Sequence, residues 1–194
     1  MSRLSQLLKR RSVGGHEPIR TTRLVLRQLT TDDLPDVATL AGDWGIASMT
    51  ARIPYPYTLA DARQWLDGLE EGEVVRAIAT PVDGRLLGLT GYLPSRDGRR
   101  AEIGYWIGRP YWGNGYATEA ASALIAFGFT SAGFEALTCC HFSDNPASRR
   151  VIEKLGFKAT GNCSCWSEAR RIQSPAEQYE LTRRDWRQLT RRRR

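Results

Sequence analysis

Three apolar runs in the middle of the chain, at residues 73–80, 85–93 and 101–108, are strand candidates. The two segments between them are short, and each contains an Asp-Gly pair, which is a strong signal for a hairpin turn. Residues 73–108 are therefore predicted to form an antiparallel meander in which each strand pairs with the next.

The pattern changes after this meander. Residues 116–130 read as a helix, residues 136–142 as a strand, and residues 146–155 as a second helix. A strand, a helix and a strand in succession predict a crossover, which normally makes the two strands parallel neighbours. A meander that leads into one parallel crossover predicts a mixed α/β sheet of the α+β-like kind, with a functional site where the parallel pair begins.

Further elements flank this core. In the strand predicted within 21–29, Leu24 and Leu26 alternate with outward-facing positions. Helices are predicted within 30–43 and 59–69, and two more strands near 157–166 and 177–182.

A Gly-Asn-Gly sequence, Gly113 to Gly115, lies directly before the helix predicted at 116–130. Both glycines can adopt positive φ and neither has a Cβ, so successive N–H groups can point into one concavity. The start of the helix adds unpaired N–H groups and the positive end of the helix dipole. This combination predicts a cradle for a diphosphate.

The glycine segment has several possible ligands. A P-loop requires Lys and then Ser or Thr after the second glycine, where this chain has Tyr116 and Ala117. A dinucleotide fingerprint requires a third glycine or alanine, where Thr118 stands. Acetyl-coenzyme A also contains a pyrophosphate and is the third ligand considered. A turn without any ligand stays open at this point.

Two separated motifs, YWGNGYATEA at 111–120 and NPASRRVIEKLGF at 145–157, resemble the Gcn5-related N-acetyltransferases, the GNAT superfamily. The segments TTRLVLRQLTTDD, IPYPYTLADARQWL and YELTRRDW resemble its RimJ/RimL-type branch. The resemblance covers roughly residues 20–187. It implies a GNAT fold, with a mostly antiparallel sheet of six or seven strands, one splayed parallel pair, and about four flanking helices.

The resemblance also implies acetyl-CoA as the co-substrate and no metal. In the family, backbone amides of a Gln/Arg-x-x-Gly-x-Gly/Ala segment wrap the pyrophosphate. Gly113 and Gly115 match its glycines, but Pro110 occupies the Gln/Arg position, which weakens any side-chain role there. The implied cradle residues are Trp112, Gly113, Asn114, Gly115, Tyr116 and Ala117.

Other cofactor contacts are implied around the splayed strands. N–H groups at Trp106 and Ile107 would bind the oxyanion or the pantetheine amides if the strand bulges there, as in the family. A plain helix N-cap explains Asn145 without any ligand. In the family pattern Asn145 would bind pantetheine, and Ser148 could donate toward the leaving sulfur.

The general base has more than one candidate. Glu102 is the first, because it lies on the strand that leads to the cradle, and a carboxylate there is the base in some family members. His141, at the end of the next strand, is the second. A surface glutamate, a structural histidine, or a chain of water molecules that relays the proton are the alternatives.

The net charge of +7 is unevenly distributed. Residues 1–20 have a net charge of +4, residues 182–194 have +6, and the rest has −3. We therefore expect a basic N-terminal arm at 1–20, an acetyltransferase domain at 21–187 and an arginine-rich tail at 188–194. A nucleic-acid-binding face on the core is disfavoured, whereas the tails could contact RNA or a membrane surface.

The N-terminal residues lack the apolar stretch of a secretory signal, and no run of about 18 apolar residues predicts a membrane span. The four cysteines occur as Cys-Cys and Cys-Ser-Cys, and neither spacing is that of a zinc site. Reduced thiols and a cytoplasmic location are expected. The oligomeric state is left as monomer or homodimer.

The function expected from these observations is direct transfer of an acetyl group from acetyl-CoA to a primary amine. A protein N-terminal amine, as in ribosomal proteins, is the preferred acceptor. Aminoglycosides, polyamines and amino acids are alternative acceptors. A non-catalytic acyl-CoA sensor and an RNA- or ribosome-associated binding protein are rival functions.

Overall fold

The structure is a computed structural model and describes residues 17–192. These residues form one eight-stranded sheet in the order β1-β2-β3-β4-β5-β6-β8-β7. The strands are β1 (Ile19–Arg20), β2 (Val25–Gln28), β3 (Val74–Ala79), β4 (Leu86–Pro94), β5 (Arg100–Ile107), β6 (Ala136–Phe142), β7 (Lys158–Ser167) and β8 (Ile172–Thr182). The helices are α2 (Leu34–Ala41), α3 (Trp44–Ala47), α4 (Leu59–Asp67), α5 (Tyr116–Thr130), α6 (Pro146–Leu155) and α7 (Arg183–Arg192), with 3-10 turns η1 (Thr31–Asp33) and η2 (Arg109–Tyr111).

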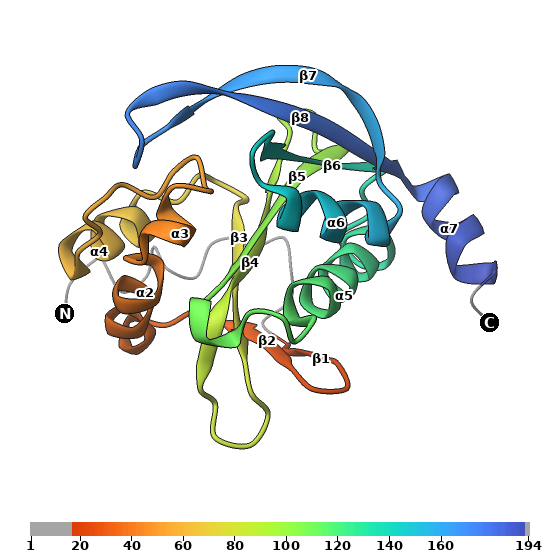
Figure 1. The fold of residues 1–194 in the computed structure, drawn as a ribbon. Coiled ribbons are helices and arrows are strands. Elements are labelled where there is room, and N and C mark those ends of the chain that lie inside the picture. Colours follow the sequence, from red (N-terminus) through yellow and green to blue (C-terminus); the bar gives the residue numbers. More distant parts are fainter. Residues whose placement is uncertain (1–16, 193–194) are drawn as a thin grey trace.

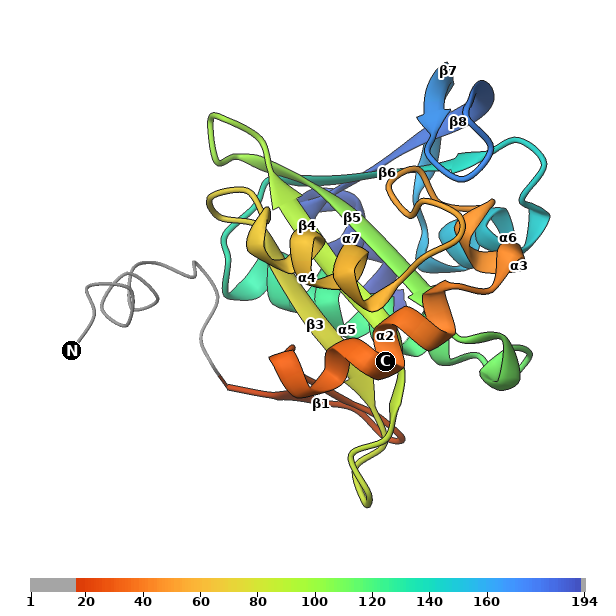
Figure 2. The same ribbon diagram turned by 90° about the vertical axis from the view of Figure 1, so that its left-hand side faces the viewer.

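Helices cover both faces of the sheet (Figure 1; Figure 2). On one face, α2 and α4 pack over Ala77, Leu86 and Leu89 of β3 and β4. On the other face, Leu124 of α5 and Ile152 of α6 belong to the larger core. Successive strand residues point to opposite faces, so β3 and β4, which are covered on both sides, are apolar almost throughout.

The predicted meander and crossover are confirmed. β3, β4 and β5 pair antiparallel in sequence order, and β5 pairs parallel with β6. The parallel pairing covers three positions only and ends at Glu102 and Thr138. Beyond that point β5 continues to Ile107 and β6 to Phe142 without pairing to each other. The two strands therefore diverge and leave an opening in the sheet (Figure 1).

The structure has more strands and more helices than the sequence predicted. The residues described form eight strands rather than six or seven, and six α-helices rather than about four. β1 has two residues and α3 has four, and neither is long enough to show a hydrophobic period. They form because neighbouring elements supply their partners, β2 in the case of β1.

The arginine-rich C-terminal segment is helical up to residue 192. Helix α7 forms because Trp186 and Leu189 pack against the core, with the Trp186 ring 5.3 Å from that of Phe129 on α5. A Cβ at Gly156, which ends α6, would lie 2.2 Å from Leu189 Cδ1, so a glycine permits this close packing. The boundary expected at residue 187 therefore lies inside a helix. Residues 193–194 of the expected tail, and 1–16 of the expected arm, lie outside the described residues.

Candidate active site

The Gly-Asn-Gly turn connects η2 to the N-terminus of α5. Gly113 and Gly115 have φ angles of 78° and 77°, in the left-handed region that favours glycine. The N–H of Trp112, which was expected in the cradle, instead donates to Arg109 O at 3.2 Å. The N–H groups of the other cradle residues, Gly113 to Ala117, and that of Thr118 have no backbone acceptor within the described chain. Consecutive free donors are therefore available at the positive end of a 15-residue helix. This geometry fits an anionic diphosphate.

Side chains of the turn fix its shape. Asn114 Nδ2 donates to the carbonyl oxygens of Tyr111 and Trp112, at 3.1 Å in both cases. Trp112 Nε1 donates to the carbonyl oxygen of Ile107 at 2.6 Å and so ties the turn to the end of β5. These two side chains hold the backbone in position, and the donor nitrogens of both are used within the protein.

A cationic side chain that sequence reasoning missed lies beside the turn. The Arg23 guanidinium carbon is 4.9 Å from the Tyr116 ring centroid, and Arg23 Nη2 is 3.7 Å from where a Cβ of Gly115 would be. Glu119 accepts from Arg23 Nε at 2.8 Å. Burial alone would raise the pKa of Glu119. Hydrogen bonds from Thr21 and Arg23 outweigh this effect, so the pKa of Glu119 is lowered. No local signal links residues 96 positions apart in the sequence.

The end of β5 presents N–H groups to the opening. Its pairing with β4 continues to Ile107 without a register shift, so the expected bulge is absent. Gly108 N donates to Leu87 O at 2.7 Å, and N–H groups alternate in direction along an antiparallel strand. The N–H of Trp106 therefore also points to β4, whereas those of Tyr105 and Ile107 point to the opening. The expectation for Trp106 is corrected, and Ile107 stays a candidate donor.

Two hydroxyl groups meet between β5 and α6. The Tyr105 hydroxyl lies 3.1 Å from Ser148 Oγ. Ser148 N donates to Asn145 Oδ1 at 3.0 Å, so Asn145 is the N-cap of α6. Burial raises the pKa of Tyr105 well above its usual value, although the hydrogen bond with Ser148 opposes this effect. The phenol is therefore a protonated donor at neutral pH. Tyr105 was not singled out from the sequence.

Glu102 is the last β5 residue that pairs with β6. Its neighbours Ala101 and Ile103 are buried in the core under α5 and α6, so the exposed Glu102 side chain points to the opposite face. Cys140 Sγ lies 3.8 Å from Glu102 Oε1. Burial, together with the nearby Glu102 charge, raises the pKa of Cys140 to about 12, so this thiol stays neutral.

His141 has a structural environment. Its side chain is in the core, and the residue is only 4% exposed. Nδ1 lies 2.7 Å from the carbonyl oxygen of Phe142, and Nε2 lies 3.2 Å from the Tyr179 hydroxyl. Both ring nitrogens therefore have partners inside the protein, and this geometry does not favour His141 as the base.

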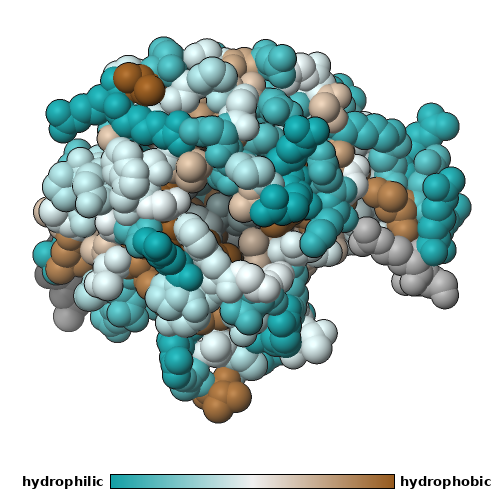
Figure 3. All heavy atoms as spheres, viewed as in Figure 1, coloured by the Kyte–Doolittle hydropathy of each residue, from teal (hydrophilic) through white to brown (hydrophobic). Residues whose placement is uncertain are grey.

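The turn between β7 and β8 contacts the segment that follows α3 and the residue Asp144 beyond β6. Arg170 Nε donates to Ser48 O at 2.6 Å, and Arg170 forms an ion pair with Asp144 at 2.8 Å. The N–H of Glu168 donates to Ala51 O at 3.0 Å. These contacts join the hairpin to the segment that follows α3. Figure 3, drawn in the same view as Figure 1, shows a hollow near the middle of the molecular surface, with apolar residues in the floor of the hollow.

Within residues 17–192, no three His, Cys, Asp or Glu side chains are grouped so that they could bind a metal ion. None of the helices in this range has both the length and the apolar composition of a membrane span.

Comparison with known proteins decides the family. Residues 23–158 match the family model described as an acetyltransferase (GNAT) domain. The chain belongs to the GNAT family. It is 32% identical over 153 residues to uncharacterized N-acetyltransferase YoaA of Bacillus subtilis (strain 168), a match that covers 74% of this chain and 84% of YoaA. The GNAT chain is accordingly an acetyl-CoA-dependent N-acetyltransferase.

Solved structures agree with the GNAT fold. RimL, a ribosomal L7/L12 alpha-N-protein acetyltransferase in complex with coenzyme A, has a TM-score of 0.72 at 16% identity, covering 86% of this chain and 98% of RimL. Spermidine N-acetyltransferase from Vibrio cholerae, in complex with CoA and spermine, has a TM-score of 0.74 at 19% identity, covering 86% of this chain and 99% of that chain.

Proposed function

We propose that this GNAT enzyme transfers the acetyl group directly to a protein N-terminal amine, of the ribosomal-protein type, in a ternary complex. One observation supports direct transfer above all others. The anion cradle and the Tyr105–Ser148 pair lie on the α5/α6 side of the opening, whereas Glu102 points to the other side. Donor and acceptor can therefore approach the same opening from opposite faces of the sheet, which brings them together without a covalent enzyme intermediate.

The cradle residues would bind acetyl-CoA mainly through the backbone. N–H groups from Gly113 to Thr118 would bind the pyrophosphate, and Arg23 would add a positive charge beside it. The N–H groups of Tyr105 and Ile107, free of β4, would bind the pantetheine amides or the developing oxyanion. When bound, acetyl-CoA supplies an activated acyl group. Asn145 could still donate from its side-chain nitrogen, since its Oδ1 is used by the cap.

Two proton transfers in the reaction are assigned to residues. Glu102 accepts the proton that the acceptor ammonium must lose before its nitrogen can attack the acyl carbon. A new C–N bond then forms, the nitrogen loses its second proton to solvent, and the C–S bond breaks. Tyr105, paired with Ser148, donates a proton to the departing sulfur and regains one from solvent. The phenol suits this role because burial keeps it protonated.

Charges on the Glu102 side of the opening, where the proposal places the acceptor, favour an acceptor with one cationic amine. Glu73 is already paired with Arg52 at 2.6 Å. This hydrogen bond, and then the charges of Glu73, Glu102 and Glu70, raise the pKa of Arg52. Glu102 forms no ion pair with the described residues, so its carboxylate is available beside the opening. Glu70 also has no ion pair there, and its charge acts on Arg52. A polyamine or an aminoglycoside would bring several cations to these few acids, whereas a peptide N-terminus brings one.

The same proposal assigns the chain to the RimJ/RimL-type branch and to the cytoplasm. Its RimL neighbour acts on a protein N-terminus by name. The four cysteines are free thiols, which suits a reducing compartment.

An assay of CoA release, in which a thiol reagent measures free CoA, tests the acceptor. We expect peptides with free N-termini to give higher kcat/KM than spermidine or an aminoglycoside. N-terminally blocked versions of the same peptides are the control and should be inactive. Faster turnover with spermidine than with every peptide would contradict the N-terminal assignment. Binding of acetyl-CoA without turnover of any amine would indicate an acyl-CoA sensor.

The Tyr105→Phe substitution tests the proton donor. We expect kcat to fall by about 10²-fold with little change in the KM for acetyl-CoA, because only the hydroxyl is lost. Since the pKa of Tyr105 is raised far above neutrality, the hydroxyl is protonated throughout ordinary assay conditions. The fold reduction should therefore be the same at every pH between about 6 and 9. A wild-type kcat in this variant would exclude Tyr105 as the donor.

A further inference from the structure

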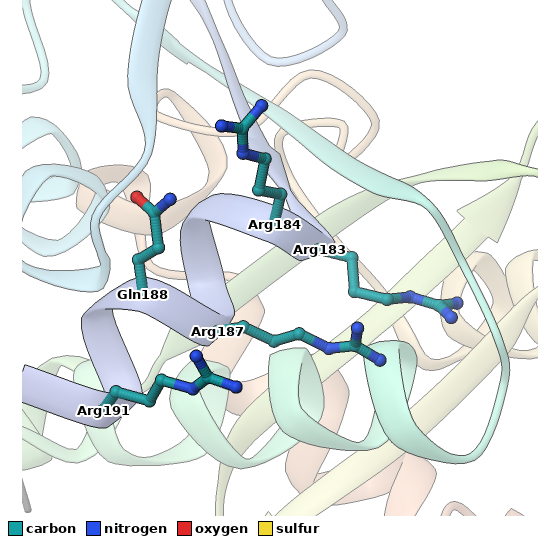
Figure 4. Close-up of a pocket in the computed structure, with 5 residues that line it drawn as sticks. All are labelled: Arg183, Arg184, Arg187, Gln188 and Arg191. Atoms are coloured by element: carbon teal, nitrogen blue, oxygen red, sulfur yellow. The ribbon is translucent and has the colours of Figure 1, made fainter.

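Helix α7 has one face in the core and one face outside it. Trp186 and Leu189 pack inward. The outer residues line a hollow of about 270 Å³, formed by Arg183, Arg184, Arg187, Gln188 and Arg191. The side chains of Arg183, Arg187 and Arg191 extend toward the same side of the helix (Figure 4). We refer to these five residues as the arginine face.

The arginine face has few internal partners. Arg183 donates from Nε to the carbonyl oxygen of Phe134 at 2.8 Å. The side chains of Arg184, Arg187 and Arg191 form no hydrogen bond or ion pair with any residue in the part of the chain that the structure describes. The acidic residue of α7, Asp185, is paired with Lys158 at 2.9 Å. Three guanidinium groups are therefore free to bind an anion.

This arrangement is unfavourable for the helix itself. Arg183 and Arg184 lie in the first turn, where the helix dipole repels cations. Arg183 and Arg187, and Arg187 and Arg191, are like charges four residues apart, which also destabilises a helix. A face that opposes local helix stability is a candidate for function.

The surrounding charge makes the arginine face distinct. Residues 182–194 have a net charge of +6, whereas residues 21–181 have −3. Residues 1–20, with +4, are also basic. An anion attracted to this protein would therefore concentrate at the two basic ends of the chain, α7 among them, and not on the acidic body of the domain.

We propose that the arginine face binds the phosphodiester backbone of a nucleic acid. Guanidinium groups four residues apart along a helix are spaced by about 6 Å along its axis, which suits a ligand with regularly repeated anions. A membrane surface suits α7 less well, because interfacial helices bury apolar side chains on the binding side. The apolar residues Trp186 and Leu189 are instead partly buried and packed against the core. The inference does not depend on acetyl transfer.

Fluorescence anisotropy with labelled single-stranded RNA, duplex RNA and duplex DNA tests the proposal, with the full-length chain at about 50 to 200 mM salt. The test variant is Arg187→Gln/Arg191→Gln. The matched control is Arg63→Gln/Arg96→Gln, which removes two exposed arginines elsewhere that also lack partners in the described chain. Glutamine keeps helix propensity and relieves like-charge repulsion, so α7 should remain folded.

We expect the wild type to bind at least one of the three nucleic acids. The test variant should lose about 10-fold in affinity, and for single-stranded RNA its slope of log K against log salt should be smaller by about 1.4. The control should keep the wild-type slope, and both variants should keep CoA release. No binding by the wild type, or equal losses in both variants, would overturn the proposal. So would binding to phosphatidylserine vesicles without binding to any nucleic acid.

Discussion

Gly115→Val is expected to weaken binding of coenzyme A by about 100-fold. The φ of Gly115 is 77°, a conformation that a β-branched residue adopts only at a cost of about 1–3 kcal/mol. The turn will relax toward negative φ and redirect the N–H groups at the start of α5. Loss of two hydrogen bonds to a charged group, at about 1.5 kcal/mol each, corresponds to that change in Kd. Titration calorimetry with CoA measures it.

Gly133→Val is the matched control for this experiment. Gly133 follows the other end of α5, has a φ of 85°, and would place its Cβ more than 4 Å from other atoms. The same backbone strain should lower Tm to a similar degree, yet leave the affinity for CoA unchanged. If Gly115→Val binds CoA as the wild type does, the turn is not the pyrophosphate site.

Glu102→Gln is expected to lower kcat by about 10²-fold or more, because a positioned base contributes about 10²–10⁴-fold. Glutamine has nearly the same size but cannot accept the ammonium proton. The loss should be greatest at low pH, where the acceptor is almost entirely protonated, and should shrink as the acceptor amine loses its proton to solvent. The affinity for CoA should not change, since Glu102 points away from the cradle. A kcat profile from low to high pH gives the measurement.

Glu135→Gln provides the comparison for the Glu102 variant. Glu135 is an exposed glutamate whose ion pair with Arg99 spans 2.7 Å at the surface, where such pairs contribute little to stability. This variant loses the same charge and should keep the wild-type pH profile. Equal profiles for Glu102→Gln and the wild type would mean that water alone relays the proton.

Local sequence predicted the elements around the site to the residue. α5, β6 and α6 have the bounds expected at 116–130, 136–142 and 146–155. The caps explain this agreement. Gly115 precedes α5 with positive φ, Asn145 and Pro146 begin α6, and Gly156 ends it with φ of 90°. Each of these signals depends only on adjacent residues.

Elements that depend on distant partners were missed or misjudged. The charge composition of the arginine-rich tail alone suggests a solvated segment. The tail forms α7 because Trp186 and Leu189 pack against the core. The same limit applies to single atoms in the site. Whether Trp106 or Ile107 offers its N–H to the opening depends on the register of β5 against β4. The Tyr105–Ser148 pair joins residues 43 positions apart, and no local pattern marks it.

The sequence by itself determined the glycine turn, the capped helix behind it and the order of strands around them. Backbone dihedral preferences and capping hydrogen bonds act between residues adjacent in the sequence, so they can be recognised in a short segment. Only the tertiary structure decided that β5 and β6 separate after Glu102, and that Tyr105 faces α5 and α6 while Glu102 faces the other side of the sheet. Strand register and side-chain facing arise from packing across the whole sheet, where a shift of one residue would exchange the two faces.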